Sequence, residues 1–163
     1  HTLKPDFSWG CSNIEKLISK YNLSDYILLF PFCSEHLQQK KWPYYDQLIK
    51  LIKQNYPNLK ILIAPGPEEI EKAKELDAVS ILSEDKPISI SELAGLIKKS
   101  KFVVANDTGP AHMAAHLNVN GLSLFGSHTT AHKVSIEREN FKAIQVSDLK
   151  NLSAQKVFER LAL

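Results

Sequence analysis

The stretch Phe102-Val-Val-Ala-Asn-Asp-Thr-Gly-Pro-Ala-His-Met-Ala-Ala-His116 decides the fold. Its first four residues are apolar and predict a strand, and Gly109 and Pro110 open a helix after a polar turn. The first N–H groups of a helix have no partner within the helix, and the helix dipole adds partial positive charge there. The corner that joins this strand to this helix is therefore suited to a phosphate or another anion.

The same unit of a strand followed by a helix recurs along the chain. Further strands are expected at 26–30, 61–64, 78–82, 121–125 and 141–146, and helices at 12–20, 43–56, 68–76, 89–99, 109–117 and after Ser153. This alternation predicts a parallel sheet of about six strands with helices on both faces, which is an α/β, doubly wound, Rossmann-like fold. Residues 1–24 are expected to form a linker and a leading helix, and residues 25–163 one domain. Ligands bind such sheets at the carboxyl ends of the strands, so the loops at 32–42, 65–67, 83–87, 106–110 and 126–132 should share one edge.

The composition is that of a globular protein of 163 residues, with 44% hydrophobic residues and a net charge of +2. No stripe of lysine and arginine with interleaved aromatic residues appears, which argues against binding nucleic acid. The two cysteines, Cys11 and Cys33, fit neither a disulfide scaffold nor a zinc site and favour a reducing compartment. No apolar run approaches the roughly 20 residues that span a membrane, and no signal peptide is visible, so a cytoplasmic location is expected. A chain that starts without methionine suggests a fragment, a processed chain or an excised domain.

Three polar side chains surround the predicted anion corner: Asp107, Thr108 and His112. Charged hydrogen bonds to a phosphate at this corner would add about 1.5–3 kcal/mol each. An isolated Asp-Thr-Gly is explained equally well by a turn in which Asp107 or Thr108 caps the helix. An aspartic protease is the other protein class that uses this triplet, but those enzymes are all-β and this chain alternates strands with helices.

Two other loops carry candidate ligand-binding residues. Lys41 stands beside Trp42 at the end of a long loop and offers a point charge to a phosphate. Glu68 and Glu69 follow a Pro-Gly-Pro turn at a predicted helix start. Physical reasoning favours pairing with the helix dipole for these two carboxylates, and hydrogen bonding to ribose hydroxyls is the functional alternative.

Several common kinds of site are not indicated by the sequence. His112 and His116 have the spacing of zinc ligands, but Met113 stands where a metalloprotease has its glutamate and no third ligand is evident, so no metal site is expected. A G-x-G-x-x-G fingerprint, a Walker A loop and a Gly-x-Ser-x-Gly motif are absent, which weakens NAD-linked, NTPase and hydrolase interpretations. A receiver-like signalling domain is disfavoured because the acidic cluster that it needs near the first strand is missing.

Five stretches of the chain together resemble one known family. They are Leu29-Phe-Pro31, Gln39-Lys-Lys-Trp-Pro43, Pro65-Gly-Pro-Glu-Glu69, Val104-Ala-Asn-Asp-Thr-Gly-Pro-Ala-His112 and Leu124-Phe-Gly126. The chain resembles the C-terminal domain of the bacterial ADP-heptose:lipopolysaccharide heptosyltransferases, glycosyltransferase family 9, from about Tyr26 to Leu161. The fourth stretch is the specific one, and the others support it.

The resemblance implies one half of a GT-B enzyme, in which two Rossmann-like domains face each other across a cleft. This half would bind a nucleotide-sugar donor. The missing N-terminal half would bind the lipopolysaccharide-core acceptor and hold the acidic general base, so this chain alone is expected to be inactive. The reaction implied is an inverting transfer of a sugar, heptose from ADP-heptose, without a metal or a cofactor, in the cytoplasm or peripherally at the inner membrane.

The resemblance also implies roles for single residues. Asp107 would hold hydroxyls of the sugar, and the amides of Thr108 and Gly109 would hold the diphosphate. His112 would support that corner, and Lys41 would neutralise the negative charge of the departing ADP. Glu68 or Glu69 would touch the ribose. Asp107 and Lys41 are thus the expected catalytic residues. Phe32 stands where the family has a glycine, which would hinder a close approach of the backbone to a phosphate. The alternative is a degenerate or non-catalytic domain that binds a nucleotide or nucleotide sugar.

Overall fold

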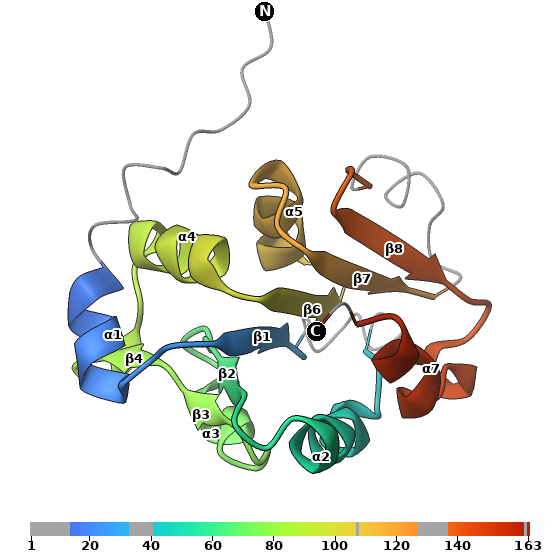
Figure 1. Ribbon diagram of the computed structural model, residues 1–163, viewed down its shortest axis with the longest axis horizontal. Helices are drawn as coiled ribbons and strands as arrows, with labels where there is room; N and C mark the ends of the chain where they lie inside the picture. The colour runs from blue at the N-terminus through green and yellow to red at the C-terminus, as the bar shows by residue number, and fades with distance from the viewer. Residues whose placement is uncertain (1–13, 33–40, 107, 127–136, 162) are drawn as a thin grey trace, which may run out of the picture.

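The computed structural model describes residues 14–32, 41–106, 108–126, 137–161 and 163, and its centre is one parallel sheet (Figure 1). The six strands of this sheet lie in the order β3-β2-β1-β6-β7-β8. Their bounds are β1 Tyr26–Phe30, β2 Lys60–Ile63, β3 Val79–Ser80, β6 Phe102–Asn106, β7 Gly121–Phe125 and β8 Phe141–Gln145. Every neighbouring pair is parallel, which confirms the predicted α/β, Rossmann-like fold.

The strand order reverses beside β1, which pairs with β2 on one side and with β6 on the other. Connections leave β1 and β6 in opposite directions, so a crevice is expected at the carboxyl ends of these two strands. Both strands are buried along their whole length. The fold therefore brings the loop after Phe30 and the loop after Asn106 to the same crevice.

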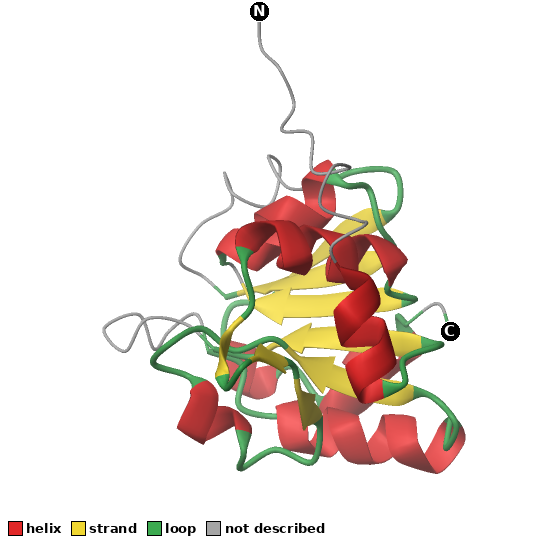
Figure 2. Ribbon diagram, turned by 90° about the vertical axis from the view of Figure 1, so that its left-hand side faces the viewer, coloured by secondary structure: helices red, strands yellow, loops and turns green. Residues whose placement is uncertain are grey.

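Helices cover both faces of the sheet, as Figure 2 shows from the side. The helices α1 Glu15–Tyr21, α4 Ile90–Lys99 and α5 Gly109–His116 share one buried apolar cluster with one face. The helices α2 Tyr45–Asn55, α3 Ile70–Ala73 and α7 Ala154–Glu159 share a second cluster with the other face. Successive residues of β1 alternate between the clusters, because side chains of a strand point to opposite faces.

Several local predictions are confirmed by the structure. The strands at 26–30 and 121–125 have the predicted bounds. The capping box at the start of α4 is present: the Ser89 side chain accepts from the Glu92 N–H at 3.1 Å, and the Glu92 carboxylate accepts from the Ser89 N–H at 2.9 Å. Ser153 caps α7 through the N–H of Lys156. The capping box predicted at Ser12 lies outside the described residues.

Other predicted bounds are wrong. The helix expected at 68–76 covers only Ile70–Ala73, because residues 66–69 form a closed turn in which the Glu69 N–H donates to the Gly66 carbonyl. The helix expected from Pro43 begins at Tyr45, so Pro43 does not take the first helical position. The strand expected at 78–82 has two residues, Val79–Ser80.

A small hairpin follows β3 and was not predicted. It pairs β4 Leu82–Ser83 with β5 Lys86–Pro87 in antiparallel orientation. Its turn residues, Glu84 and Asp85, have φ of 52° and 65°. Positive φ is usual in such two-residue turns, but Asn-Gly or Asp-Gly is the pair that reveals it in a sequence, and this turn has neither.

Tyr26 supplies a pH-dependent part of the stability. Its side chain is buried and its hydroxyl donates to the Leu96 carbonyl of α4 at 2.5 Å. Burial raises the pKa of Tyr26 above its ordinary value, because the phenolate would lose its water.

We expect the free energy of unfolding to fall as pH rises past about 10, because the unfolded chain releases this proton first. Denaturant titrations at pH values of about 8 and about 10.5 measure the effect against Tyr26→Phe. The variant should lose less stability over that interval than the parent chain. An equal loss in both proteins would show that Tyr26 does not carry the effect.

Candidate functional site

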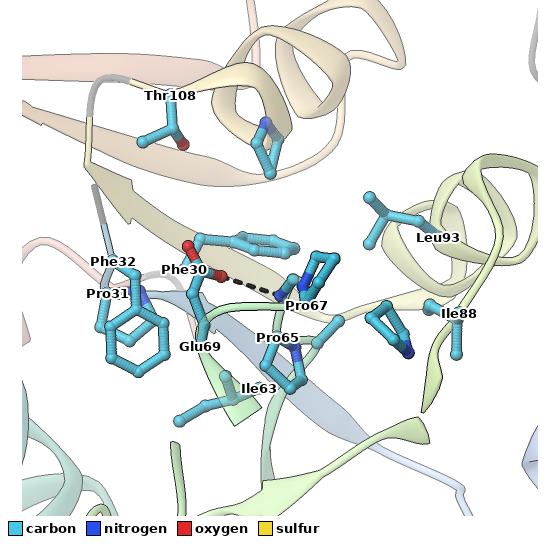
Figure 3. A pocket seen from close by; sticks show the side chains of 14 residues that line it. Phe30, Pro31, Phe32, Ile63, Pro65, Pro67, Glu69, Ile88, Leu93 and Thr108 are labelled. Carbon is cyan, nitrogen blue, oxygen red and sulfur yellow. Dashed lines mark hydrogen bonds between the residues drawn. The ribbon is translucent and has the colours of Figure 1, made fainter. Parts of the chain in front are cut away.

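A cavity of about 420 Å³ lies at the carboxyl edge of the sheet (Figure 3). Its walls come from the ends of β1 and β2, from β5, and from the starts of α4 and α5. Among its described lining residues, Glu69 is the only ionisable one and Thr108 the only one with a hydroxyl. The remaining walls are mostly apolar, and they include Phe30, Phe32, Ile88 and Leu93. The cavity thus has the general character of a small-molecule site, with apolar walls and a few polar groups.

The start of α5 forms one rim of this cavity through Thr108 and Pro110. The Thr108 carbonyl accepts from the N–H groups of Ala111 and His112 at 3.1 and 3.3 Å, and Pro110 has no N–H. Within the described residues, no acceptor is found for the N–H of Thr108 or Gly109. These two amides are the pair that sequence reasoning assigned to a diphosphate.

Gly109 faces open space. It is exposed, and a Cβ placed on it would meet no heavy atom within 4 Å beyond its chain neighbours and the backbone of its own helix. Its φ is not in the positive range, so a left-handed backbone is not the reason for glycine there. Because glycine has no side chain, it does not cover the end of the helix that carries partial positive charge.

The two predicted acidic residues differ in position. Glu69 is half-buried, lines the cavity, and accepts from the Gly66 N–H through Oε1 at 2.8 Å (Figure 3). Its Oε2 has no protein partner among the described residues. Glu68 is exposed and does not line the cavity. Of the two, Glu69 alone is placed to touch a molecule bound there.

Lys41 lines a second cavity, of about 480 Å³. Its other charged lining residues are Asp46, Lys72 and Glu75. The two cavities share Pro31 and Phe32, so they adjoin at the end of β1. The structure therefore does not place Lys41 in the same cavity as Thr108, which sequence reasoning had grouped with it. Phe32 lies between them as a common wall.

The remaining predicted residues lie apart from the first cavity or outside the description. His112 is half-buried in the first turn of α5 and lines neither cavity. Asp107 lies outside the described residues. In the part of the chain that the structure describes, no group of three or more His, Cys, Asp or Glu side chains could hold a metal ion. The described helices include none with the length and apolar character needed to cross a membrane.

Asn106 is a site residue to which sequence reasoning gave no role. It is fully buried at the end of β6 and is hydrogen bonded to Pro31 and Tyr45. A polar residue at the end of an otherwise apolar strand was the available signal. Its partners are distant in the sequence, so the pattern alone could not identify them.

Known proteins resemble the chain in sequence and in structure. The model of glycosyltransferase family 9 (heptosyltransferase) matches residues 1–161. Lipopolysaccharide heptosyltransferase 1 of Campylobacter coli is 31% identical over 114 residues, which are 64% of this chain and 33% of that protein. The E. coli ADP-heptose lps heptosyltransferase II superposes with a TM-score of 0.73 at 20% identity, over 98% of this chain and 51% of that one. E. coli heptosyltransferase WaaC with ADP-2-deoxy-2-fluoro heptose superposes with a TM-score of 0.70 at 24% identity, over 85% of this chain and 42% of that one.

At these identities the structural likeness shows the fold alone, which is one Rossmann-like half of the GT-B architecture. The chain spans about a third of its curated relative and about half or less of the two solved chains. The chain therefore matches only one part of these longer relatives.

Proposed function

Because the chain belongs to glycosyltransferase family 9, the heptosyltransferase family, we propose that it is the donor-binding, C-terminal half of a heptosyltransferase-like enzyme. The reaction we propose is transfer of heptose from ADP-heptose to the lipopolysaccharide core. The observation that carries the proposal is the pair of Thr108 and Gly109 amides, which have no acceptor among the described residues, next to an apolar cavity that Thr108 lines. The E. coli relative with a bound ADP-heptose analogue supports the choice of donor.

The chemistry of the first cavity suits an adenine nucleotide. Its apolar walls would cover the faces of a purine, and its volume of about 420 Å³ is within the range of ligand sites. Glu69 Oε2 is an acceptor for ribose hydroxyls. A diphosphate that leaves the cavity toward α5 would meet the amides of Thr108 and Gly109 and the positive end of the helix dipole.

We propose that the transfer inverts the anomeric centre and needs no metal. In this scheme, helix amides and Lys41 stabilise the negative charge that develops on the departing ADP. Lys41 reaches that charge from the adjoining cavity, past Phe32, along its flexible four-carbon stem. Asp107 holds hydroxyls of the transferred sugar, and His112 supports the corner from the first turn of α5.

The general base and the acceptor contacts belong in this proposal to an N-terminal half, so the chain alone would bind the donor without transferring the sugar. We place the enzyme in the cytoplasm or peripherally at the inner membrane. A purely non-catalytic nucleotide-binding domain is the alternative, and we do not favour it, because family membership covers nearly the whole chain.

ADP is expected to stabilise the chain against heat. At a free concentration 100 times Kd, ADP should add about 2.7 kcal/mol to the free energy of unfolding. Asp107→Ala should weaken binding of an ADP-sugar more than binding of ADP, because the carboxylate serves the sugar. Thermal melts and calorimetric titrations measure both effects.

Asp25→Ala is the matched control, since Asp25 is exposed and precedes β1 at the opposite edge of the sheet. It should leave both affinities unchanged. A melting temperature that stays constant in millimolar ADP would contradict the proposed function. Equal losses of ADP and ADP-sugar affinity in Asp107→Ala would contradict the role given to Asp107.

A further inference from the structure

The side chain of Asn106 connects three elements at the carboxyl edge of the sheet. It is completely buried. Its Nδ2 donates to the Pro31 carbonyl at 2.9 Å, and its Oδ1 accepts from the Tyr45 hydroxyl at 3.2 Å. These bonds join the end of β6 to the end of β1 and to the first residue of α2.

The bond to Pro31 extends the pairing of two strands beyond their last backbone pair. The register of β1 and β6 ends at Phe30 and Ala105. The next residue of β1 is a proline, which has no N–H and cannot continue a ladder. The Asn106 amide binds the Pro31 carbonyl at this point, so the two chain segments stay together where the cavity begins.

Stability alone gives little reason for an amide in this position. Burying a polar side chain is unfavourable unless its hydrogen bonds are made, and an apolar residue of similar shape is often as stable. A buried and bonded amide does fix direction and spacing, because each bond holds only over a narrow range of distance and angle.

We propose that Asn106 is a positioning residue for the nucleotide site, an inference that rests on the proposed function. Pro31 and Phe32 form one wall of the cavity, and Thr108 and Pro110 at the start of α5 also line it. Figure 3 shows Thr108 and the pair Pro31 and Phe32 on separate segments beside the same space. Asn106 is bonded to Pro31 and lies two residues before Thr108, so its side chain sets the spacing between wall and rim.

The test compares variants by isothermal titration with ADP and by amide chemical shifts of the free protein. Asn106→Leu keeps the approximate shape and removes both bonds. Tyr45→Phe removes the bond to Oδ1, leaves the bond from Nδ2 to Pro31 in place, and is the milder variant should Asn106→Leu not fold. Ser123→Ala is the matched control: Ser123 is also fully buried, stands opposite Ala105 on the neighbouring strand β7, and its hydroxyl has no partner among the described residues.

We expect Asn106→Leu to raise the Kd for ADP about tenfold and Tyr45→Phe about threefold, with the fraction of binding-competent protein unchanged. In the free protein, the amide shifts of Phe32, Thr108 and Gly109 should move in Asn106→Leu and stay in place in Ser123→Ala. A merely structural role would lower the binding-competent fraction and leave Kd as it is.

The outcomes separate this inference from the proposed function. If the parent chain binds ADP and Asn106→Leu binds it with the same Kd, the positioning role is overturned and the proposed function stands. If Asn106→Leu does not fold, an unchanged Kd in Tyr45→Phe overturns the positioning role in the same way. If the parent chain does not bind ADP, the proposed function is overturned and this inference with it.

Discussion

Gly109→Val is expected to weaken ADP binding at least about tenfold, because its branched side chain would occupy the surface at which the amides meet the diphosphate. A Cβ at this position would meet no heavy atom within 4 Å beyond the chain neighbours of Gly109 and the backbone of its own helix, so no other segment occupies this space. The residue is exposed at the start of α5, and its φ is not in the range that favours glycine. Because Gly109 directly precedes Pro110 in α5, a branched residue there is also expected to lower the free energy of unfolding, and binding is therefore compared only under conditions where the variant is folded.

Adenosine provides the matched control for this variant. It offers the same base and ribose without the phosphates, so its affinity should be equal in Gly109→Val and in the parent chain. Titration of both ligands against both proteins measures the difference. An equal affinity of the two proteins for ADP, or an equal loss for ADP and adenosine, would show that the diphosphate does not lie at Gly109.

Trp42→Ala is expected to lower the free energy of unfolding by about 3–5 kcal/mol. The indole is 1% exposed, and its Nε1 donates to the Leu152 carbonyl at 2.7 Å. Its ring packs edge-on against Tyr45 with centroids 4.9 Å apart. The side chain thus ties the segment before α2 to the segment before α7, and its removal leaves a cavity and an unpaired carbonyl.

Trp42→Phe separates these two contributions. It keeps most of the ring volume and loses the hydrogen bond, which should cost about 1–3 kcal/mol. Urea titrations monitored by circular dichroism give both values. A loss below about 1 kcal/mol in Trp42→Ala would contradict the anchoring role of this residue, since large buried aromatic side chains ordinarily cost several times more.

The parts of the fold that could be predicted from sequence are those with strong local signals. The continuous apolar runs at 26–30 and 121–125 gave strands with the observed bounds, and the Ser89 and Glu92 pair gave the start of α4. The start of α2 near Pro43 could not be predicted, because Trp42 binds a carbonyl 110 residues away. The turn at Gly66 is local, since Glu69 closes it from three residues further on, but the same residues also fit the start of a helix.

For the candidate site, too, local sequence patterns indicate some residues, whereas the positions of other side chains depend on the folded chain. The amides of Thr108 and Gly109 follow from a strand, a turn and a helix in succession, which is a local pattern, and Thr108 is one of the residues that line the cavity. Sequence position alone could not distinguish Glu69 from Glu68 or show that Lys41 lies in an adjoining cavity. The directions of single side chains depend on packing between distant segments.

A crystal structure of the chain with bound ADP is the decisive test of the proposed donor site. We expect the base to lie in the apolar cavity and the diphosphate oxygens to lie within hydrogen-bonding distance of the Thr108 and Gly109 amides. Well-defined ADP bound elsewhere, with the Gly109 amide in contact with solvent alone, would show that the donor does not bind at the start of α5.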